Sequence, residues 1–232
     1  MRFDIITIFP EIFSSFLKTS IIERAIYNGL LSIYIHDLRN FTDDTHRTTD
    51  DYPYGGGAGM VMKPEPIAKA IESIKRENHS NVIYLTPQGK LFNQDYAEEL
   101  SKREGLVLLC GRYRGIDERI RELFIDEEIS IGDYILSGGE IASMVVIETV
   151  SRLIPGVLGN EASLEEETFA NYIIDPPQYT RPAEFKGIKV PEILLSGDHK
   201  AIERWRREIA IERTRKNRPD LYKKCIKKIK NE

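Results

Sequence analysis

The chain has 232 residues, of which 41% are hydrophobic and 30% are charged, and its formal net charge is −4. This composition is typical of a globular protein with a core and excludes a chain that is disordered throughout. The two cysteines and four histidines have no zinc-ligand spacing and cannot form a disulfide framework, so we expect no structural metal. With no long apolar run and no signal-peptide pattern, we expect a cytoplasmic protein without membrane association.

Strand-like and helix-like segments alternate over the first three fifths of the chain. Short apolar runs predict strands at Phe3–Phe9, Ser32–His36, Asn81–Thr86, Leu106–Cys110 and Glu128–Leu136. Helical periodicity or apolar richness predicts helices at Ser20–Leu31, Glu65–Arg76, Gln94–Arg103 and Glu140–Leu153. This alternation favours an α/β domain built on a mostly parallel sheet.

The rest of the chain has a different character. Periodicity fails between Gly159 and Asp175, where carboxylates cluster, and we predict a linker there. Asp198 has the position of an N-cap for a helix with Ile202, Trp205 and Ile209 on one face, and a last helix is expected from Pro219. The predicted organisation is therefore an α/β domain at 1–159, a linker at 160–175 and a small helical domain at 176–232.

Positive charge is concentrated at the end of the chain. Residues 198–232 contain 13 basic and 6 acidic side chains although the whole chain is acidic, and the last helix carries Lys223, Lys224, Lys227 and Lys228. A basic patch on an acidic protein suggests a polyanionic partner such as nucleic acid. A solvated helical face is the alternative explanation.

Three glycine-containing segments each follow a predicted strand: Leu85–Gly89, Cys110–Gly115 and Ile131–Gly139. In open α/β sheets, ligands bind at the carboxyl ends of the strands, where glycine permits close backbone approach. The three segments therefore predict a shared pocket, although each alone could be a simple turn. They offer backbone groups and few charges, which favours a neutral or zwitterionic ligand carrying a heterocycle over a triphosphate.

A fourth glycine cluster, Tyr54–Met60, matches neither a phosphate-binding loop nor the dinucleotide motif G-x-G-x-x-G. Four glycines in five residues indicate a loop that is mobile or pressed against a ligand. The preceding run His46–Asp51 offers a base, an acid and an arginine, and its alternative explanation is a solvated loop.

Taken together, these motifs resemble bacterial tRNA (guanine-N1)-methyltransferases of the SPOUT class. The resemblance runs in order from residue 1 to about residue 221, and it rests on Tyr52–Met60, Cys110–Tyr113, Gly115–Arg119, Ser130–Tyr134, Leu136–Glu140, Ser151–Arg152, Ile154–Gly159, Tyr179–Pro182 and Leu194–Gly197. It implies a deep trefoil knot in the α/β domain and a homodimer. It also implies methyl transfer from S-adenosylmethionine to N1 of guanosine 37 of tRNA, where a guanosine precedes the target.

The resemblance also assigns site residues. The implied cofactor contacts are Tyr84, Leu85, Thr86, Pro87, Gly89, Gly111, Tyr113, Gly115, Ile131, Gly132, Tyr134, Leu136, Gly138 and Gly139. The implied substrate contacts are Arg47, Asp50, Gly59 and Arg112, and the implied catalytic pair is Arg152 and Glu167. The resemblance also allows Mg²⁺ as a further cofactor.

Three positions depart from the family pattern. Glu167 stands where the family has its general-base aspartate, Arg114 where it commonly has glutamate, and Ala142 where proline is frequent. Glu167 keeps the carboxylate that would remove the N1 proton of guanine, and Arg152 would stabilise the charge that develops on O6. Without the resemblance, Arg152 would be interpreted as a cation at a helix C-terminus.

Two other functions fit the same residues. One is a SPOUT enzyme that methylates another RNA position, which the cofactor loops permit but the motifs at Tyr52–Met60 and Thr180–Leu221 disfavour. The other is an RNA-binding protein without catalysis, which the replacement of aspartate by Glu167 makes conceivable.

Overall fold

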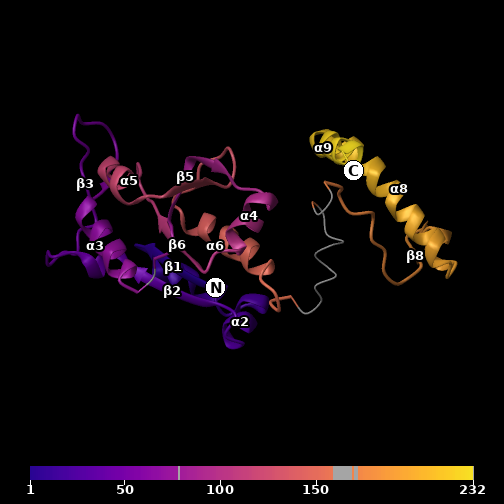
Figure 1. Ribbon diagram of the computed structural model, residues 1–232, viewed down its shortest axis with the longest axis horizontal. Helices are drawn as coiled ribbons and strands as arrows, with labels where there is room; N and C mark the ends of the chain where they lie inside the picture. The colour runs from indigo at the N-terminus through magenta and orange to yellow at the C-terminus, as the bar shows by residue number, and fades with distance from the viewer. Residues whose placement is uncertain (78, 159–168, 170–171, 232) are drawn as a thin grey trace. The chain divides into compact units, whose positions relative to one another are not determined.

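The computed structural model describes residues 1–77, 79–158, 169 and 172–231 (Figure 1). The chain divides into two compact units, Met1–Gly159 and Asn160–Glu232. Each unit has its own secondary structure and its own buried side chains.

A five-stranded parallel sheet forms the centre of the first unit. Its strands are β1 (Arg2–Thr7), β2 (Ser32–Asp37), β5 (Val82–Leu91), β6 (Gly105–Cys110) and β7 (Glu127–Ser130), in the order β2-β1-β6-β5-β7. Ile5 pairs with Ile35 on one side and Leu108 on the other, and Leu108 pairs with Ile83. Every residue of β6 is buried, as expected for a central strand covered on both faces. The α/β class with a parallel sheet, predicted from the sequence, is confirmed.

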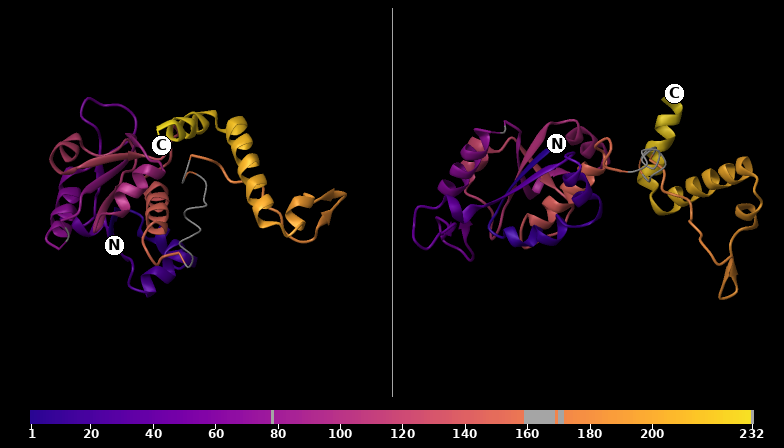
Figure 2. Two further views of the ribbon diagram at one scale, coloured as in Figure 1. Left: turned by 45° about the vertical axis from the view of Figure 1, so that its right-hand side comes forward. Right: turned by 90° about the horizontal axis from the view of Figure 1, so that it is seen from below.

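Helices cover both faces of this sheet (Figure 2). On one face, α1 (Phe13–Phe16), α2 (Ser20–Tyr27), α4 (Gln94–Ser101) and α6 (Glu140–Arg152) pack on side chains such as Ile5, Leu85 and Leu108. On the other face, α3 (Pro64–Lys75) and α5 (Glu118–Phe124) cover Ile6 and Leu109. The two clusters of buried apolar side chains place the sheet as the middle of three layers.

Short elements connect these layers. Two 3₁₀ turns, η1 (Pro10–Ile12) and η2 (Leu38–Phe41), follow β1 and β2. The strands β3 (Asp50–Asp51) and β4 (Val61–Met62) pair antiparallel, with Asp50 opposite Met62. The glycine-rich segment is therefore the loop of a small hairpin.

The second unit is mainly helical. It contains β8 (Glu184–Phe185), β9 (Ile188–Lys189), η3 (Glu192–Leu195), α8 (His199–Asn217) and α9 (Pro219–Asn231). Oδ1 of Asp198 accepts a hydrogen bond from the Ala201 amide at 3.1 Å, which confirms the predicted N-cap, and α9 begins at Pro219 as predicted. Ile202, Trp205 and Ile209 are half-buried along one face of α8.

One strand predicted in the first unit is too long, and one helix lies where no helix is predicted. The strand predicted at Glu128–Leu136 ends at Ser130, because the chain turns at Gly132, whose φ is +147°, and leaves the sheet. The helix α5 was not predicted, since its seven residues are too short to show clear periodicity. In the part of the chain that the structure describes, no helix is long and apolar enough to cross a membrane.

Candidate functional site

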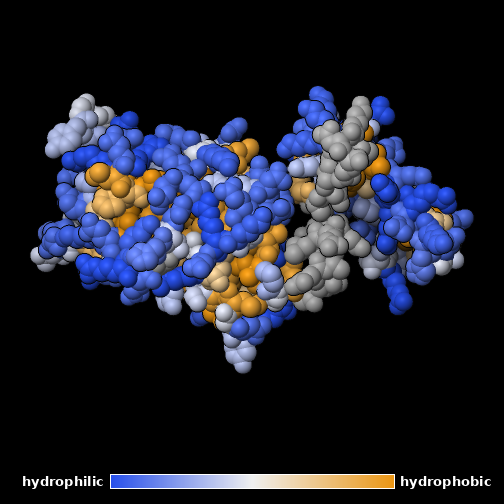
Figure 3. Space-filling model, in the orientation of Figure 1, coloured by the Kyte–Doolittle hydropathy of each residue, from blue (hydrophilic) through white to orange (hydrophobic). Residues whose placement is uncertain are grey.

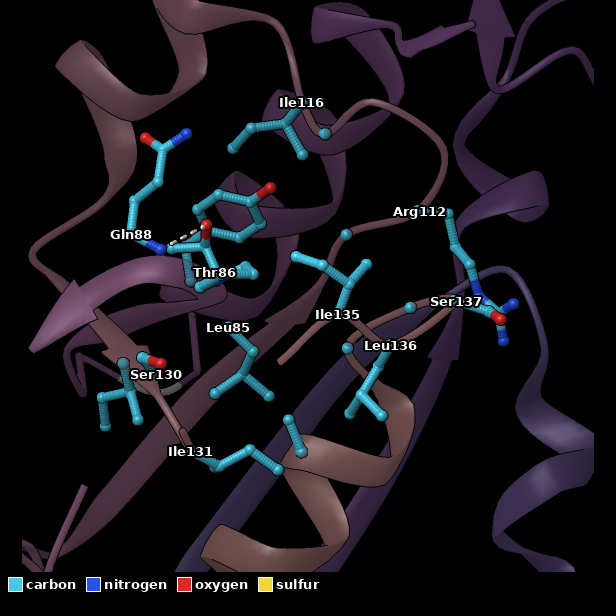
Figure 4. A pocket seen from close by; sticks show the side chains of 18 of the residues that line it. Leu85, Thr86, Gln88, Arg112, Ile116, Ser130, Ile131, Ile135, Leu136 and Ser137 are labelled. Carbon is cyan, nitrogen blue, oxygen red and sulfur yellow. Dashed lines mark hydrogen bonds between the residues drawn. The ribbon is translucent and has the colours of Figure 1, made fainter. Parts of the chain in front are cut away.

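A cavity of about 650 Å³ opens at the carboxyl ends of β6 and β7 and beside the middle of β5 (Figure 4). Its volume is in the range of small-molecule sites. The wall consists of the three glycine-containing segments, with contributions from α5 and from Ala142 at the start of α6. The shared pocket predicted from these segments is thus present.

A bulge in β5 shapes one side of the cavity. Leu85 and Lys90 both pair with Ile129 of β7, so the residues between them leave the ladder, and Thr86, Pro87 and Gln88 among them line the cavity. The Thr86 hydroxyl accepts a hydrogen bond from the Gln88 amide at 3.4 Å (Figure 4). At Gly89 a Cβ would lie 2.4 Å from the Ile129 amide nitrogen, so only glycine permits this approach of the two backbones.

The segment after β7 crosses the end of β6. The Gly139 amide donates to the Gly111 carbonyl at 2.9 Å, and Arg112 forms an isolated antiparallel bridge with Gly138. A Cβ at Gly139 would lie 2.8 Å from the Cα of Cys110, which is backbone and cannot move aside. The absence of a side chain at Gly139 therefore allows α6 to start directly against β6.

Arg112 is held in the cavity wall by a buried carboxylate. Its Nε donates to both oxygens of Glu140, at 3.2 and 3.0 Å, and its guanidinium lies 4.5 Å from the centre of the Phe9 ring. Glu140 is 1% exposed and also accepts a hydrogen bond from the Thr7 hydroxyl at 2.8 Å. These contacts restrict the orientation of Arg112, because its charge-assisted hydrogen bonds to a buried carboxylate that is itself hydrogen-bonded leave few alternative geometries.

A second arginine supports the opposite wall. The Arg121 guanidinium donates to Glu128 through Nε and Nη2, both at 2.7 Å, and to the Gln88 side chain at 3.0 Å. It also lies 5.7 Å from the centre of the Tyr84 ring. Burial raises the pKa of Tyr84 above its ordinary value, so this phenol stays protonated and can donate a hydrogen bond near neutral pH.

The Tyr113 side chain connects the cavity to the β3–β4 hairpin. Burial, together with the charge of Asp50 and a hydrogen bond to it, raises the pKa of the Tyr113 phenol. Tyr113 has a φ of +58°, which is uncommon for a residue with a side chain. The contact brings Asp50, predicted as a substrate contact, next to the cavity wall.

A comparison with known protein families gives a single strong result. The family model described as tRNA (Guanine-1)-methyltransferase TrmD matches residues 1–224. This chain belongs to that family.

Individual members of the family cover nearly the full chain. A protein from Dictyoglomus turgidum is 57% identical over 97% of this chain and 91% of its own length, and one from Clostridioides difficile is 52% identical over 98% and 100%. A protein from Citrifermentans bemidjiense is 55% identical over 95% and 89%. All three are named tRNA (guanine-N(1)-)-methyltransferase.

Most of the cofactor contacts implied by the family resemblance line one cavity. These are Tyr84, Leu85, Thr86, Pro87, Gly111, Tyr113, Gly115, Ile131, Gly132, Tyr134, Leu136, Gly138 and Gly139. Gly89 is the exception, since it packs against the backbone of β7. The structure brings these residues together, and their role as cofactor contacts stays a prediction.

The predicted substrate and catalytic residues are more dispersed. Arg112 lines the cavity, whereas Arg47, Asp50 and Gly59 belong to the β3–β4 hairpin or the chain before it and are not part of the cavity wall. Arg152 is the last residue of α6, half-buried and outside the cavity wall. Glu167 lies outside the described residues.

One residue of the cavity wall and one residue that supports the wall are not predicted by the sequence. Glu140, which orients Arg112, and Arg121, which supports Tyr84, were not singled out. A carboxylate directly after two glycines at a helix start was the available signal for Glu140. Among the described residues, no group of three or more histidine, cysteine or acidic side chains could hold a metal ion.

Proposed function

We propose that this chain transfers a methyl group from S-adenosylmethionine to N1 of guanosine 37 in tRNA whose preceding nucleotide is also guanosine. The main support is the match to the tRNA (Guanine-1)-methyltransferase family over residues 1–224, together with a cavity lined by the residues implied as cofactor contacts. The position and the methyl donor follow from the family resemblance and are part of the proposal.

The cavity fits a ligand that carries an adenine ring. Leu85, Ile131 and Leu136 provide apolar side chains from three directions (Figure 4). Glycines at several turns bring backbone amides and carbonyls to the surface, where they can pair with the edge of a heterocycle. When bound, S-adenosylmethionine would supply an electrophilic methyl group on its sulfonium.

We extend the proposal to a trefoil knot around this cavity. Its support is the crossing of the segment at 131–139 over the end of β6, with Gly139 bonded to Gly111, before α6 packs on the sheet. A crossing of this kind holds three loops rigidly around one ligand, which favours a fixed geometry for reaction.

The position of Arg152 favours a homodimer. Ala142 is the residue of α6 that lines the cavity, and the ten helical steps from Ala142 to Arg152 span about 15 Å. That distance exceeds the span of an arginine side chain, so Arg152 cannot reach the cavity of its own chain. We propose that Arg152 of one protomer acts at the cavity of its partner.

An exposed apolar surface on α6 fits such an interface. Ile141 and Val145, one turn apart on the helix, are 56% and 39% exposed. Figure 3 shows an apolar area over the later part of α6 and next to α2. Exposed apolar surface on a helix favours a contact with another protein.

Two side chains of the protein would take part in the reaction, one as the base that removes a proton and one as the cation that stabilises negative charge. Guanine N1 is a weak nucleophile until its proton leaves, and Glu167 is the proposed base that accepts it. As the proton leaves, negative charge develops on O6, where the Arg152 guanidinium would stabilise it. Extrusion of the base from its stack costs a few kcal/mol, which contacts in the pocket offset.

The second unit is the proposed tRNA-binding region. Residues 198–232 carry an excess of seven positive charges, and α8 and α9 account for most of them. Contacts between such side chains and phosphates give affinity without sequence preference.

Methyl transfer to two tRNA transcripts tests the proposal. One transcript has guanosine at positions 36 and 37, and the other has adenosine at 37. The proposal requires transfer from labelled S-adenosylmethionine to the first transcript alone, with 1-methylguanosine identified by mass spectrometry. Transfer to a different nucleotide would support another RNA methyltransferase, and cofactor binding without transfer would support an RNA-binding protein.

A further inference from the structure

The side chain of Arg114 runs along the glycine-rich loop of the β3–β4 hairpin. A Cβ built at Gly59 would lie 3.1 Å from Cγ of Arg114, and one at Gly57 would lie 2.8 Å from its Nη1. The Arg114 amide also donates to the Met60 carbonyl at 3.1 Å. The guanidinium therefore lies against the loop backbone at Gly57, which is outside the cavity wall.

Other arginines near the cavity have acidic partners, and Arg114 differs from them. Arg112 pairs with Glu140, Arg121 with Glu128, and Arg119 with Asp117. Within the described part of the chain, no acidic side chain forms an ion pair with Arg114, which is exposed to solvent. A guanidinium in this position is available to an anion from outside the chain.

The surroundings of Arg114 are those of a nucleic-acid contact. Tyr52 and Tyr54 belong to the same loop and are 80% and 100% exposed. Exposed aromatic rings next to a cation suit unpaired bases and the phosphates between them. Arg114 is also one of the residues that line the cavity, so a phosphate at its guanidinium would belong to a nucleotide close to the base that enters.

We propose that Arg114 and the glycine-rich loop form a phosphate-binding subsite for the RNA backbone next to the target nucleotide. The inference rests on the proposed function, because it takes tRNA as the partner. The competing ligand is the carboxylate of the methyl donor's amino-acid part. We favour the RNA because the guanidinium lies along Gly57 and Gly59, which are not part of the cavity wall.

The test measures tRNA and cofactor binding separately on the full chain. Binding of the guanosine-37 transcript is followed at several salt concentrations, and binding of S-adenosylhomocysteine by calorimetry. Arg114→Ala should weaken tRNA binding by about fivefold and reduce the slope of log K against log salt by about 0.7, which corresponds to one single-strand phosphate contact. Its affinity for S-adenosylhomocysteine should stay unchanged.

Arg119→Ala is the charge-matched control. Arg119 is five residues along the chain, is exposed and is neutralised by Asp117 at 2.7 Å. Its removal should leave the salt slope as it is. Equal slopes for the two variants, or a loss of S-adenosylhomocysteine affinity in Arg114→Ala with tRNA binding unchanged, would overturn the proposed subsite.

Two glycine variants test the contact with the loop. Gly57→Ala places a methyl group at the guanidinium, whereas Gly55→Ala introduces a side chain at a similar positive φ with nothing within 4 Å. Gly57→Ala should therefore weaken tRNA binding more than Gly55→Ala does, and the difference should vanish when Arg114 is already alanine. A difference that persists without Arg114 would contradict the contact.

The same binding measurements distinguish failure of the proposed function from failure of the subsite alone. A wild-type chain that binds neither S-adenosylhomocysteine nor tRNA would overturn the proposed function and the subsite together. A wild-type chain that binds both, with Arg114→Ala indistinguishable from it, would overturn the subsite alone.

Discussion

The two ends of α6 differ in what surrounds them. At the first end, Gly139 touches the backbone of β6, Glu140 is buried against Arg112, and Ala142 lines the cavity. At the last end, Arg152 is half-buried and lies about 18 Å away along the helix axis. The residues proposed to bind the cofactor thus line the cavity of their own chain, whereas Arg152, proposed for catalysis, is not part of that cavity wall. Binding and chemistry are therefore expected to respond to different substitutions.

The largest effect is expected at the last end of the helix. Arg152→Ala should lower kcat by about 10²- to 10³-fold, as does the loss of other charge-stabilising donors, because it removes the group that stabilises O6. S-adenosylhomocysteine affinity should not change, since Arg152 is not part of the cavity wall. A parallel loss of affinity would place Arg152 in the binding site and remove the contrast between the two ends.

At the first end of α6, a substitution of Glu140 should lower the stability of the fold and loosen the orientation of Arg112. Glu140→Gln removes the charge that faces Arg112 and should lower the free energy of unfolding by about 2 kcal/mol. Denaturant unfolding measures this change. The matched control is Glu148→Gln on the same helix, half-buried rather than buried, which should have an effect below about 0.5 kcal/mol. Equal effects would show that Arg112 does not depend on Glu140.

Crowding at the same end should affect ligand binding. Gly139→Ala pushes a methyl group against the Cα of Cys110, so the segment at 131–139 or α6 has to shift. Overpacking of this kind costs about 1 to 3 kcal/mol, and we expect a loss of S-adenosylhomocysteine affinity in calorimetry of about tenfold. Unchanged affinity would mean that this crossing does not set the shape of the cavity.

The strands and the cavity wall could be predicted from the sequence, because both depend on local residue patterns. Apolar runs located the five strands, and glycines after three of them located the cavity wall. The strand predicted to Leu136 was wrong after Ser130, because apolar residues that line a cavity have the same pattern as those in a strand. The ion pair of Arg112 with Glu140 joins residues 28 apart, and no local pattern contains it.

The catalytic assignments depended on resemblance rather than on pattern. The role of Arg152 rests on a family motif, and the helix predicted at Glu140–Leu153 already places this residue at the far end from the glycine segment. Glu167 lies outside the described residues, so its role stays a prediction. The N-cap at Asp198 was predicted correctly because capping depends on only a few neighbouring residues.

The smallest expected effect lies at the start of β7, away from the cavity. Glu127 is half-buried, and this partial burial opposes ionisation, but hydrogen bonds from Arg103, Tyr96 and Asn81 outweigh it and hold the pKa of Glu127 below the ordinary value of 4.5. A lowered pKa in the folded state stabilises the protein above pH 4.5, and that stability is lost as the pH falls through the folded-state value.

Glu127→Gln should remove this part of the pH dependence. Its unfolding free energy near neutral pH should be lower than that of the wild type by about 1 kcal/mol, and the two proteins should converge in acid. Urea unfolding between pH 6 and pH 3 measures both curves, and methyl transfer measured alongside should stay unchanged. Parallel curves would contradict the assignment of the pKa shift to these hydrogen bonds.

Complementation between two inactive subunits tests most directly whether the two ends of α6 serve different cavities. One subunit carries Arg152→Ala, and the other carries Leu136→Glu, which places a charge in the apolar cavity wall. The two are co-expressed with different tags, and the mixed dimer is purified. If Arg152 acts on the partner's cavity, the mixed dimer has one complete site and should show about half of the wild-type activity, although each parent dimer is inactive. A mixed dimer as inactive as its parents would contradict the account, because it would place Arg152 and the cavity of the same chain in one site.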